Sequence, residues 1–144
     1  WYDMEKQELT FVNCGHNPVL LLDESGHKLF DQTSPPLGVV GKEDFSPSIV
    51  TLAYTPLSVL YIVTDGISEA MIKVTKDKEQ EIGMEGLLRI TQKQTTLSAI
   101  ERAKQTLALI RSQKLRATDD ATILVIMYEE IASEASPSKN ENQS

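Results

Sequence analysis

A run of five apolar residues, Val59 to Val63, ends in the sequence Thr-Asp-Gly, and this stretch constrains the fold more than any other. A short continuous run of β-branched and aromatic residues predicts a strand that is buried on both faces. A glycine at position 66 permits a sharp backbone turn beside the carboxylate of Asp65. The next residues, Ile67 to Met71, predict the first turn of a helix. A carboxylate at the end of a buried strand is either a turn residue or a ligand, and these residues alone leave both interpretations open.

A second strand, expected over residues 118–127, begins with two acids, Asp119 and Asp120. If the two strands are antiparallel neighbours, the end of the first and the start of the second lie at the same edge of a sheet. Asp65 then faces only one of the two later acids, because side chains alternate between the faces of a strand. Carboxylates packed so closely repel each other unless a cation lies between them, and all-oxygen ligation suits Mg²⁺ or Mn²⁺. The two strands together predict a divalent metal site.

Length and charge narrow the class of protein. The chain has 144 residues, 40% of them hydrophobic, and a net charge of −7, so one domain with a hydrophobic core is expected. The acidic balance argues against non-specific binding to nucleic acid or to anionic membranes. No apolar run approaches the roughly 20 residues that a membrane-spanning helix needs. The single cysteine fits a reducing, cytoplasmic compartment. The chain begins at Trp1 without an initiator methionine, which suggests a piece of a longer protein.

The order of the remaining elements is strands, then helices, then a closing strand, which favours an α+β fold over alternating βαβ units. The other expected strands cover residues 9–14, 19–22, 28–30 and 48–53, and the expected helices cover residues 84–90 and 96–112. A hairpin is expected between the first two strands, and a charged surface loop at residues 73–81. Thr96 is the expected N-cap of the second helix. A domain of residues 1–131 is expected to precede a disordered polar tail, residues 132–144.

Three other motifs suggest chemistry, but each lacks a necessary partner. Ser68 lies in a sequence that resembles a nucleophile elbow, yet both histidines, His16 and His27, precede it, whereas the triad histidine follows the serine in that class of hydrolase. Cys14 could be the thiolate nucleophile of a phosphatase, but no arginine follows it closely to stabilise a bound phosphate. Residues 38–43 resemble a phosphate-binding loop but lack the hydroxyl residue that follows its lysine. His16 lies in a turn from which it could face either the acidic cluster or solvent.

Four short motifs, in this order, resemble the SpoIIE/RsbU-type serine phosphatases, a bacterial branch of the metal-dependent PPM (protein phosphatase 2C-like) family. They are Asn-Cys-Gly-His-Asn-Pro at residues 13–18, Pro-Leu-Gly at 36–38, Thr-Asp-Gly-Ile-Ser-Glu-Ala at 64–70 and Asp-Asp-Ala-Thr at 119–122. The resemblance runs from about Leu9 to Tyr128 and covers the C-terminal part of the family's domain. It implies an αββα sandwich of the PPM phosphatase type, with the N-terminal portion missing from this chain.

The resemblance also implies a metal site. Asp65 and Asp119 match metal ligands of the family, with Asp120 as a further candidate, and the intact domain would bind two Mn²⁺ or Mg²⁺ ions. Three further residues are candidates for lining the site: Asn13, His16 and Gly66. No side chain is expected to act as the nucleophile, because two metal ions activate a water molecule for in-line attack on the phosphoryl group.

The implied activity is hydrolysis of phosphoserine or phosphothreonine on a regulatory protein, such as an anti-anti-sigma factor of the STAS type. Members of the family often carry upstream sensory or receiver domains, and a membrane sensor could tether the intact protein. The family's first metal-binding acid, in a Gly-Asp segment, would precede Trp1. The chain alone is therefore expected to bind metal weakly and to hydrolyse little substrate. An uncovered sheet face is expected to favour self-association.

The alternative hypothesis is a catalytically inactive relative that binds a phosphoprotein or a regulator without hydrolysing it. The sequence upstream of Trp1 would discriminate between the two, because only an active enzyme needs the Gly-Asp acid.

Overall fold

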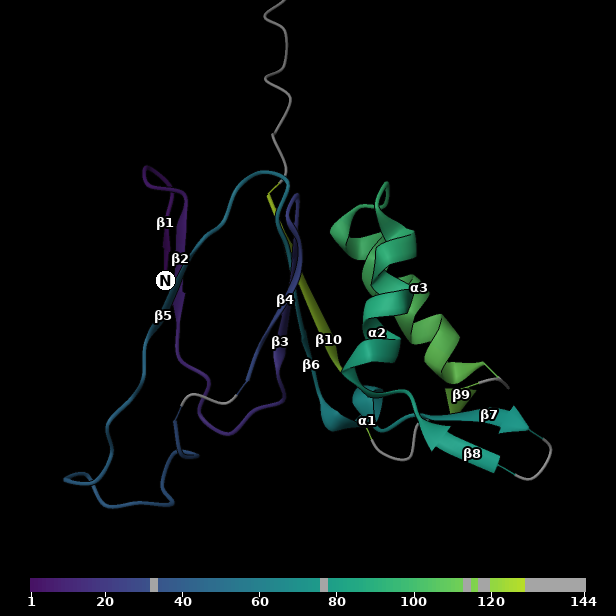
Figure 1. Ribbon diagram of the computed structural model, residues 1–144, viewed down its shortest axis with the longest axis horizontal. Helices are drawn as coiled ribbons and strands as arrows, with labels where there is room; N and C mark the ends of the chain where they lie inside the picture. Colours follow the sequence, from purple (N-terminus) through teal and green to yellow (C-terminus); the bar gives the residue numbers. More distant parts are fainter. Residues whose placement is uncertain (32–33, 76–77, 113–114, 117–119, 129–144) are drawn as a thin grey trace, which may run out of the picture.

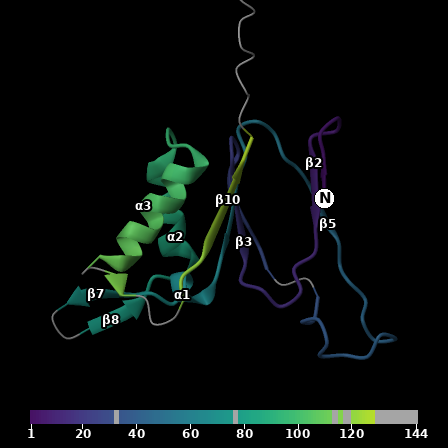
Figure 2. The ribbon, with the colours of Figure 1, turned by 180° about the vertical axis from the view of Figure 1, so that it is seen from behind.

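The computed structural model describes residues 1–31, 34–75, 78–112, 115–116 and 120–128, and the structural statements below concern these residues. They form three layers (Figure 1): a three-stranded sheet, a four-stranded sheet beside it, and helices against the other face of the four-stranded sheet. The view from behind shows the same order of layers (Figure 2). The α+β class predicted from the sequence is confirmed. The predicted boundary at residue 131 and the tail of residues 132–144 lie outside the described residues.

Two antiparallel sheets make up the β-layers. The three-stranded sheet has the order β1 (Tyr2–Asp3), β2 (Glu8–Phe11), β5 (Val50–Ala53). The four-stranded sheet has the order β10 (Ile123–Met127), β6 (Val59–Val63), β3 (Val19–Asp23), β4 (Gly26–Phe30). The predicted hairpin between residues 9–14 and 19–22 is wrong, because β2 and β3 belong to different sheets. The segment between them, residues 12–18, crosses from one sheet to the other.

Strand β6 lies in the interior of the four-stranded sheet and pairs with β10 on one side and β3 on the other. Four of its five residues are buried, as the unbroken apolar run predicted. In the antiparallel ladder with β10, Val63 is opposite Ile123. The end of β6 and the start of β10 therefore lie at the same edge of the sheet, which confirms the arrangement predicted from the sequence.

Each face of the four-stranded sheet is covered by a separate hydrophobic core. One core lies between this sheet and the helices; its fully buried members include Leu20, Tyr61 and Leu87. The other lies between the two sheets and includes Leu60 and Tyr54. The two cores follow from the alternation of side chains along β6, which sends Leu60 and Tyr61 to opposite faces.

The residues after β6 form a shorter helix than predicted. Helix α1 (Asp65–Ser68) has a single turn, and the chain then enters β7 (Met71–Thr75). Strand β7 pairs with β8 (Lys78–Glu81) and with β9 (Leu115–Arg116) in a third, small sheet. The predicted surface loop at residues 73–81 is therefore wrong in its described part, which forms a hairpin. All four residues of β8 are exposed and polar, so this strand carries no apolar alternation that a sequence pattern would reveal.

Both longer helices were predicted. Helix α2 (Gly83–Thr91) is followed by the short 3₁₀ helix η1 (Gln92–Gln94) and then by α3 (Ala99–Arg111). The N-cap of α3 is Ser98 and not the predicted Thr96. Ser98 Oγ accepts a hydrogen bond from the Glu101 backbone N–H, and the Glu101 carboxylate accepts from the Ser98 N–H at 2.9 Å, which together form a capping box. None of the helices in the described part of the chain combines the length and hydrophobicity that crossing a membrane requires.

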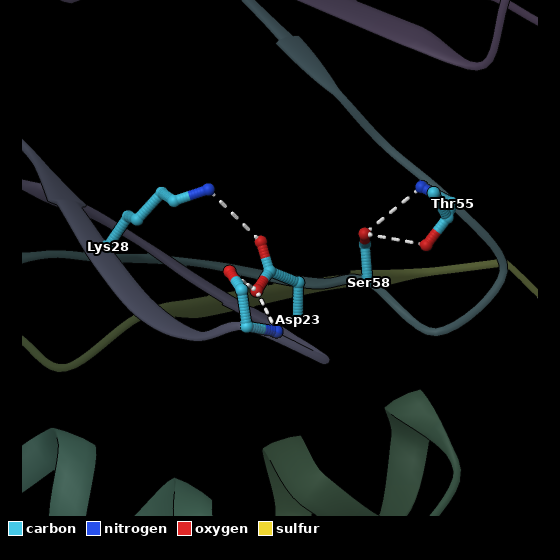
Figure 3. A network of polar contacts seen from close by, with 5 residues as sticks. Asp23, Lys28, Thr55 and Ser58 are labelled. Atoms are coloured by element: carbon cyan, nitrogen blue, oxygen red, sulfur yellow. Dashed lines mark hydrogen bonds and ion pairs between the residues drawn. The ribbon is translucent and has the colours of Figure 1, made fainter.

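Polar turns stabilise the end of the four-stranded sheet that lies away from Asp65 (Figure 3). The Asp23 carboxylate accepts a hydrogen bond from the Ser25 backbone N–H at 2.8 Å and forms an ion pair with Lys28 at 3.4 Å. The hydrogen bond from the Ser25 hydroxyl is the main cause that lowers the pKa of Asp23. Just before β6, the Ser58 hydroxyl accepts from the Thr55 N–H at 3.0 Å.

A buried arginine joins α3 to the centre of β6. Arg102 is 3% exposed, and its guanidinium donates to the Tyr61 hydroxyl oxygen at 2.8 Å. It also donates to the backbone carbonyls of Leu97 at 2.8 Å and Thr95 at 2.9 Å. Burial raises the pKa of Tyr61, and the hydrogen bond from Arg102 opposes that shift. These contacts satisfy a charge whose burial would otherwise be costly.

The variant Tyr61→Phe is expected to lower the free energy of unfolding by about 1–3 kcal/mol, because it leaves a buried guanidinium N–H without an acceptor. Urea unfolding followed by circular dichroism measures this difference. Tyr2→Phe is the control, since its hydroxyl is only partly buried and lies 3.3 Å from the Tyr54 carbonyl oxygen. An equal loss in both variants would contradict the role assigned to Arg102.

Tyr54 makes the stability of the fold sensitive to alkaline pH. Its hydroxyl donates to the Ile126 carbonyl at 2.7 Å and so connects the two sheets, and burial raises its pKa to about 12. The unfolded chain therefore loses this proton at lower pH than the folded chain, so the contribution is complete below about pH 10 and is lost as the pH approaches 12. Urea unfolding at a series of alkaline pH values should give a shallower pH dependence for Tyr54→Phe than for the wild type; identical slopes would exclude Tyr54 as the cause.

Candidate functional site

The carboxylate of Asp65 lies at the sheet edge where β6 ends and α1 begins. Its Oδ1 accepts a hydrogen bond from the Gly66 N–H at 3.0 Å, and its backbone carbonyl accepts from the Glu69 N–H at 2.7 Å. The residue is exposed, whereas Gly66 and Ile67 behind it are buried. Gly66 does not have the positive φ that a sharp turn would require. The chain turns by entering α1 directly, with Asp65 as its first residue.

Thr64 connects this turn to the start of β10. Its backbone N–H donates to the Thr122 carbonyl at 3.1 Å, and its hydroxyl accepts from the Thr122 N–H at 2.9 Å. The same hydroxyl donates to the Asp120 backbone carbonyl at 3.0 Å. Because Thr64 precedes Asp65 and is hydrogen-bonded to Asp120, the structure brings Asp65 and Asp120 to the same edge of the sheet. Asp119, the other predicted ligand, lies outside the described residues.

The segment that crosses between the sheets folds over the same edge. Asn13 is buried; its side-chain oxygen accepts from the His16 N–H at 2.9 Å, and its amide donates to the Asn17 carbonyl at 3.1 Å. Gly15 has a φ of +82°, and a Cβ there would lie 2.5 Å from Pro36 Cγ. A residue with a side chain is excluded at that position by both the backbone conformation and the contact with Pro36. The two motifs at residues 13–18 and 36–38 are therefore packed against each other.

Asn17 attaches this segment to the Asp65 turn. Its amide donates to the Val63 carbonyl at 3.4 Å and to the Ser68 hydroxyl at 3.2 Å. The Ser68 hydroxyl in turn donates to the Asp65 carbonyl at 3.3 Å. Ser68, which lies in a sequence that resembles a nucleophile elbow, is thus a structural support of α1.

Gly15, His16, Asn17, Thr64 and Asp65 together line a cavity of about 180 Å³. His16 therefore shares a cavity with Asp65 while its side chain stays exposed, so both orientations considered from the sequence apply in part. Asn13 supports this cavity from behind and does not line it. Cys14 does not line this cavity; it lines an apolar pocket of about 280 Å³ between the two sheets, which His16 also lines.

The donor set fits part of a divalent metal site. Among the described residues, no group of three or more His, Cys, Asp or Glu side chains is placed to hold a metal ion. Of the side chains that line the cavity, Asp65 supplies the carboxylate and His16 an imidazole, whereas the Thr64 hydroxyl and the Asn17 amide are already hydrogen-bonded within the protein. Carboxylate oxygens suit Mg²⁺ or Mn²⁺, which bind proteins through one or two carboxylates and complete their coordination with water or phosphate oxygens.

Sequence reasoning did not predict the supporting roles of three residues of this edge: Thr64, Asn17 and Ser68. Each acts through hydrogen bonds to backbone atoms or to another supporting side chain. Thr64 lies inside the Thr-Asp-Gly motif and Asn17 follows Gly-His, so both residues were visible in the sequence motifs. A motif does not reveal which distant residues form hydrogen bonds with them.

The variant Thr64→Val is expected to lower the free energy of unfolding by about 0.5–1.5 kcal/mol, because valine keeps the shape and removes both hydroxyl hydrogen bonds. The amide of Thr122 should also exchange with solvent faster, as measured by hydrogen exchange. Thr64→Ser retains the hydroxyl and serves as the control. Unchanged protection of Thr122 in Thr64→Val would show that the hydroxyl does not hold the two segments together.

Comparisons with known proteins agree on one family. The family model described as "Stage II sporulation protein E (SpoIIE)" matches residues 1–129. Phosphoserine phosphatase RsbP of Bacillus subtilis (strain 168) is 38% identical over 68 residues, which cover 46% of this chain and 16% of that protein.

Solved structures show the same fold. The SiaA-PP2C domain of Pseudomonas aeruginosa superposes with a TM-score of 0.69 at 16% identity, over 90% of this chain and 50% of that one. The phosphatase domain of the cell fate determinant SpoIIE from Bacillus subtilis (Mn presoaked) gives 0.64 at 17% identity, over 90% and 55%. The predicted PPM phosphatase fold is thereby confirmed, and the chain spans about half the length of these two domains.

Proposed function

Because this chain belongs to the stage II sporulation protein E (SpoIIE) family, we propose that it contributes the Asp65 side of the active site in a metal-dependent protein serine/threonine phosphatase. The observation that carries this proposal is the pairing of β6 with β10, which brings Asp65 and Asp120 to one edge of the sheet. A relative named as a phosphoserine phosphatase supports the same reaction class.

The proposed ligands are Asp65 with Asp119 and Asp120, which would hold Mn²⁺ or Mg²⁺ ions. When bound, two such ions supply a hydroxide from water and neutralise charge on the phosphoryl group. The residues of this chain orient the carboxylate: the Gly66 N–H binds Asp65 Oδ1, and Thr64 holds the segment of Asp120 beside it. His16 lines the same cavity as Asp65, and its proposed role is to contact the substrate there.

The proposed substrate is a regulatory protein that carries phosphoserine or phosphothreonine, such as a STAS-type anti-anti-sigma factor, as the family resemblance implied. The described residues place no activated nucleophile beside Asp65, since Ser68 is engaged with Asn17 and the Asp65 carbonyl and Cys14 lies in another pocket. A metal-activated water is consistent with that arrangement.

A second candidate function is an inactive phosphatase-like domain that binds a phosphoprotein or regulator. It is the alternative that the sequence left open. The two candidates differ in whether the protein releases phosphate from a phosphoserine peptide.

In a protein that contains the whole phosphatase domain, Asp65→Asn is expected to reduce Mn²⁺-dependent phosphate release to the background rate, because the amide keeps the shape of the carboxylate but removes its charge. Phosphate release from a phosphoserine peptide measures activity, and electron paramagnetic resonance measures bound Mn²⁺. The 144-residue chain by itself is expected to bind Mn²⁺ weakly and to release little phosphate.

Asp23→Asn is the matched control, because Asp23 lies at the opposite end of the same sheet and should not affect Mn²⁺ binding. Full activity in Asp65→Asn would remove Asp65 from the metal site. A wild-type domain that binds the phosphopeptide without releasing phosphate would favour the second candidate.

A further inference from the structure

We propose that the cleft between α2 and the β7–β8 hairpin docks a segment of the phosphoprotein substrate, and that this segment carries an apolar side chain flanked by lysine or arginine. This inference rests on the proposed phosphatase function and names a recognition surface for it. The cleft has a volume of about 590 Å³, so it is larger than the cavity at Asp65 and large enough to receive side chains of a partner protein.

The floor of the cleft is apolar and comes from two elements. Ile72 of β7 is paired directly with Gln80 of β8, so both side chains lie on the same face of the hairpin. Ile82, Met84 and Ile90 complete the apolar lining from the start and one side of α2. All four apolar residues are only partly buried by the hydrophobic core. Further burial by a partner's apolar side chain would therefore be favourable.

A glycine in the middle of α2 lets the Ile82 side chain of the cleft lining pack against the helix. Gly86 lies on the same helix face as Ile82 and Ile90, four residues from each. A Cβ at position 86 would lie 2.3 Å from Ile82 Cγ1, so a larger residue would push the Ile82 side chain away. Glycine inside a helix costs about 0.5–1 kcal/mol relative to alanine, and here it makes room for Ile82 against the helix.

The rim of the cleft is acidic toward the Asp65 end. Glu81 and Glu85 are exposed, and among the described residues that line the cleft Arg89 is the one that is basic; its guanidinium lies 3.8 Å from the Glu85 carboxylate. Lys78 lies at the other end of β8, toward the tip of the hairpin, because it pairs with Thr75 while Glu81 pairs with Met71. The end of the cleft near the site thus presents more acids than bases and complements lysine or arginine on a partner.

The cleft is attached directly to the candidate site. Strand β7 begins two residues after Glu69, the C-cap of α1, and the Ile82 N–H donates to the Ala70 carbonyl at 2.8 Å. Both ribbon views show α1 at the base of α2, where the hairpin begins (Figures 1 and 2). A protein whose phosphoserine lies at Asp65 can therefore reach the cleft with a neighbouring segment.

The test uses the 144-residue chain and fluorescence anisotropy with labelled phosphoserine peptides. One peptide carries leucine and lysine beside the phosphoserine, a second replaces the lysines by glutamate, and a third replaces the leucine by serine. The first peptide should bind about tenfold more tightly than either of the others, and the preference over the glutamate peptide should shrink as salt is added. The double variant Glu81→Gln/Glu85→Gln should weaken binding of the first peptide about fivefold.

The matched control is Glu24→Gln/Glu43→Gln, which removes two exposed carboxylates that do not line the cleft and should leave affinity within about twofold. Equal affinity for the three peptides, no measurable binding of the first, or no effect of the cleft variant would overturn the proposal. Sedimentation that shows self-association, lost in the cleft variant, would also overturn it and make a second copy the occupant.

Failure of the docking proposal and failure of the phosphatase proposal give different results. An unphosphorylated copy of the leucine–lysine peptide should still bind the wild-type chain more tightly than the Glu81→Gln/Glu85→Gln variant, whatever reaction takes place at Asp65. Conversely, a protein that contains the whole phosphatase domain could release phosphate in an Asp65-dependent way from all three peptides equally. That result would support the phosphatase proposal and rule out the docking proposal.

Discussion

The antiparallel pairing of β6 with β10 is the constraint on which the candidate site depends. Strand β6 is covered by hydrophobic cores on both faces, so its position is fixed by packing along its whole length. The functional groups are placed beyond the last ladder pair, Val63 and Ile123, where the backbone is free of strand pairing but still anchored. Asp65 thus combines solvent access with a rigid base, which is what a ligand for a divalent ion requires.

Hydrogen bonds extend this rigidity to segments that are distant in sequence. Thr64 connects the turn to the start of β10, and Asn17 connects it to the segment that crosses between the two sheets. That crossing segment is in turn packed on Pro36 through Gly15. Each of the four motifs that marked the family is therefore part of one connected structure around Asp65, insofar as its residues are described. The short motifs are far apart in the sequence, but their described residues meet at one edge of the four-stranded sheet.

Patterns that reflect burial were predictable, and patterns that depend on tertiary partners were not. The apolar run of β6 and the helical spacing of α3 gave correct elements, because a buried strand and an amphipathic helix each show a local period. Strand β8 was missed since its residues are all exposed, and only the pairing with β7 makes it a strand. The membership of β2 and β3 in different sheets was missed because turn-forming residues between two strands fit a crossing as well as a hairpin.

Thr96 and Ser98 are both residue types that cap helices well, and the hydrogen bond between the Glu101 carboxylate and the Ser98 N–H selects Ser98. In the site, Asp65 followed from a motif, whereas the roles of Thr64 and Asn17 lie in contacts that no local pattern contains.

Arg102 has a consequence for how α3 is seated on the sheet. Apolar contacts tolerate small rotations of a helix about its own axis, because one methyl group can replace another in the same space. The guanidinium of Arg102 has donors in a fixed planar fork, and they meet a hydroxyl on β6 and two carbonyls that precede α3. Rotation of α3 about its own axis would move the guanidinium away from the Tyr61 hydroxyl, which belongs to the sheet. A single polar side chain therefore favours one orientation of α3 against the strand that ends at Asp65.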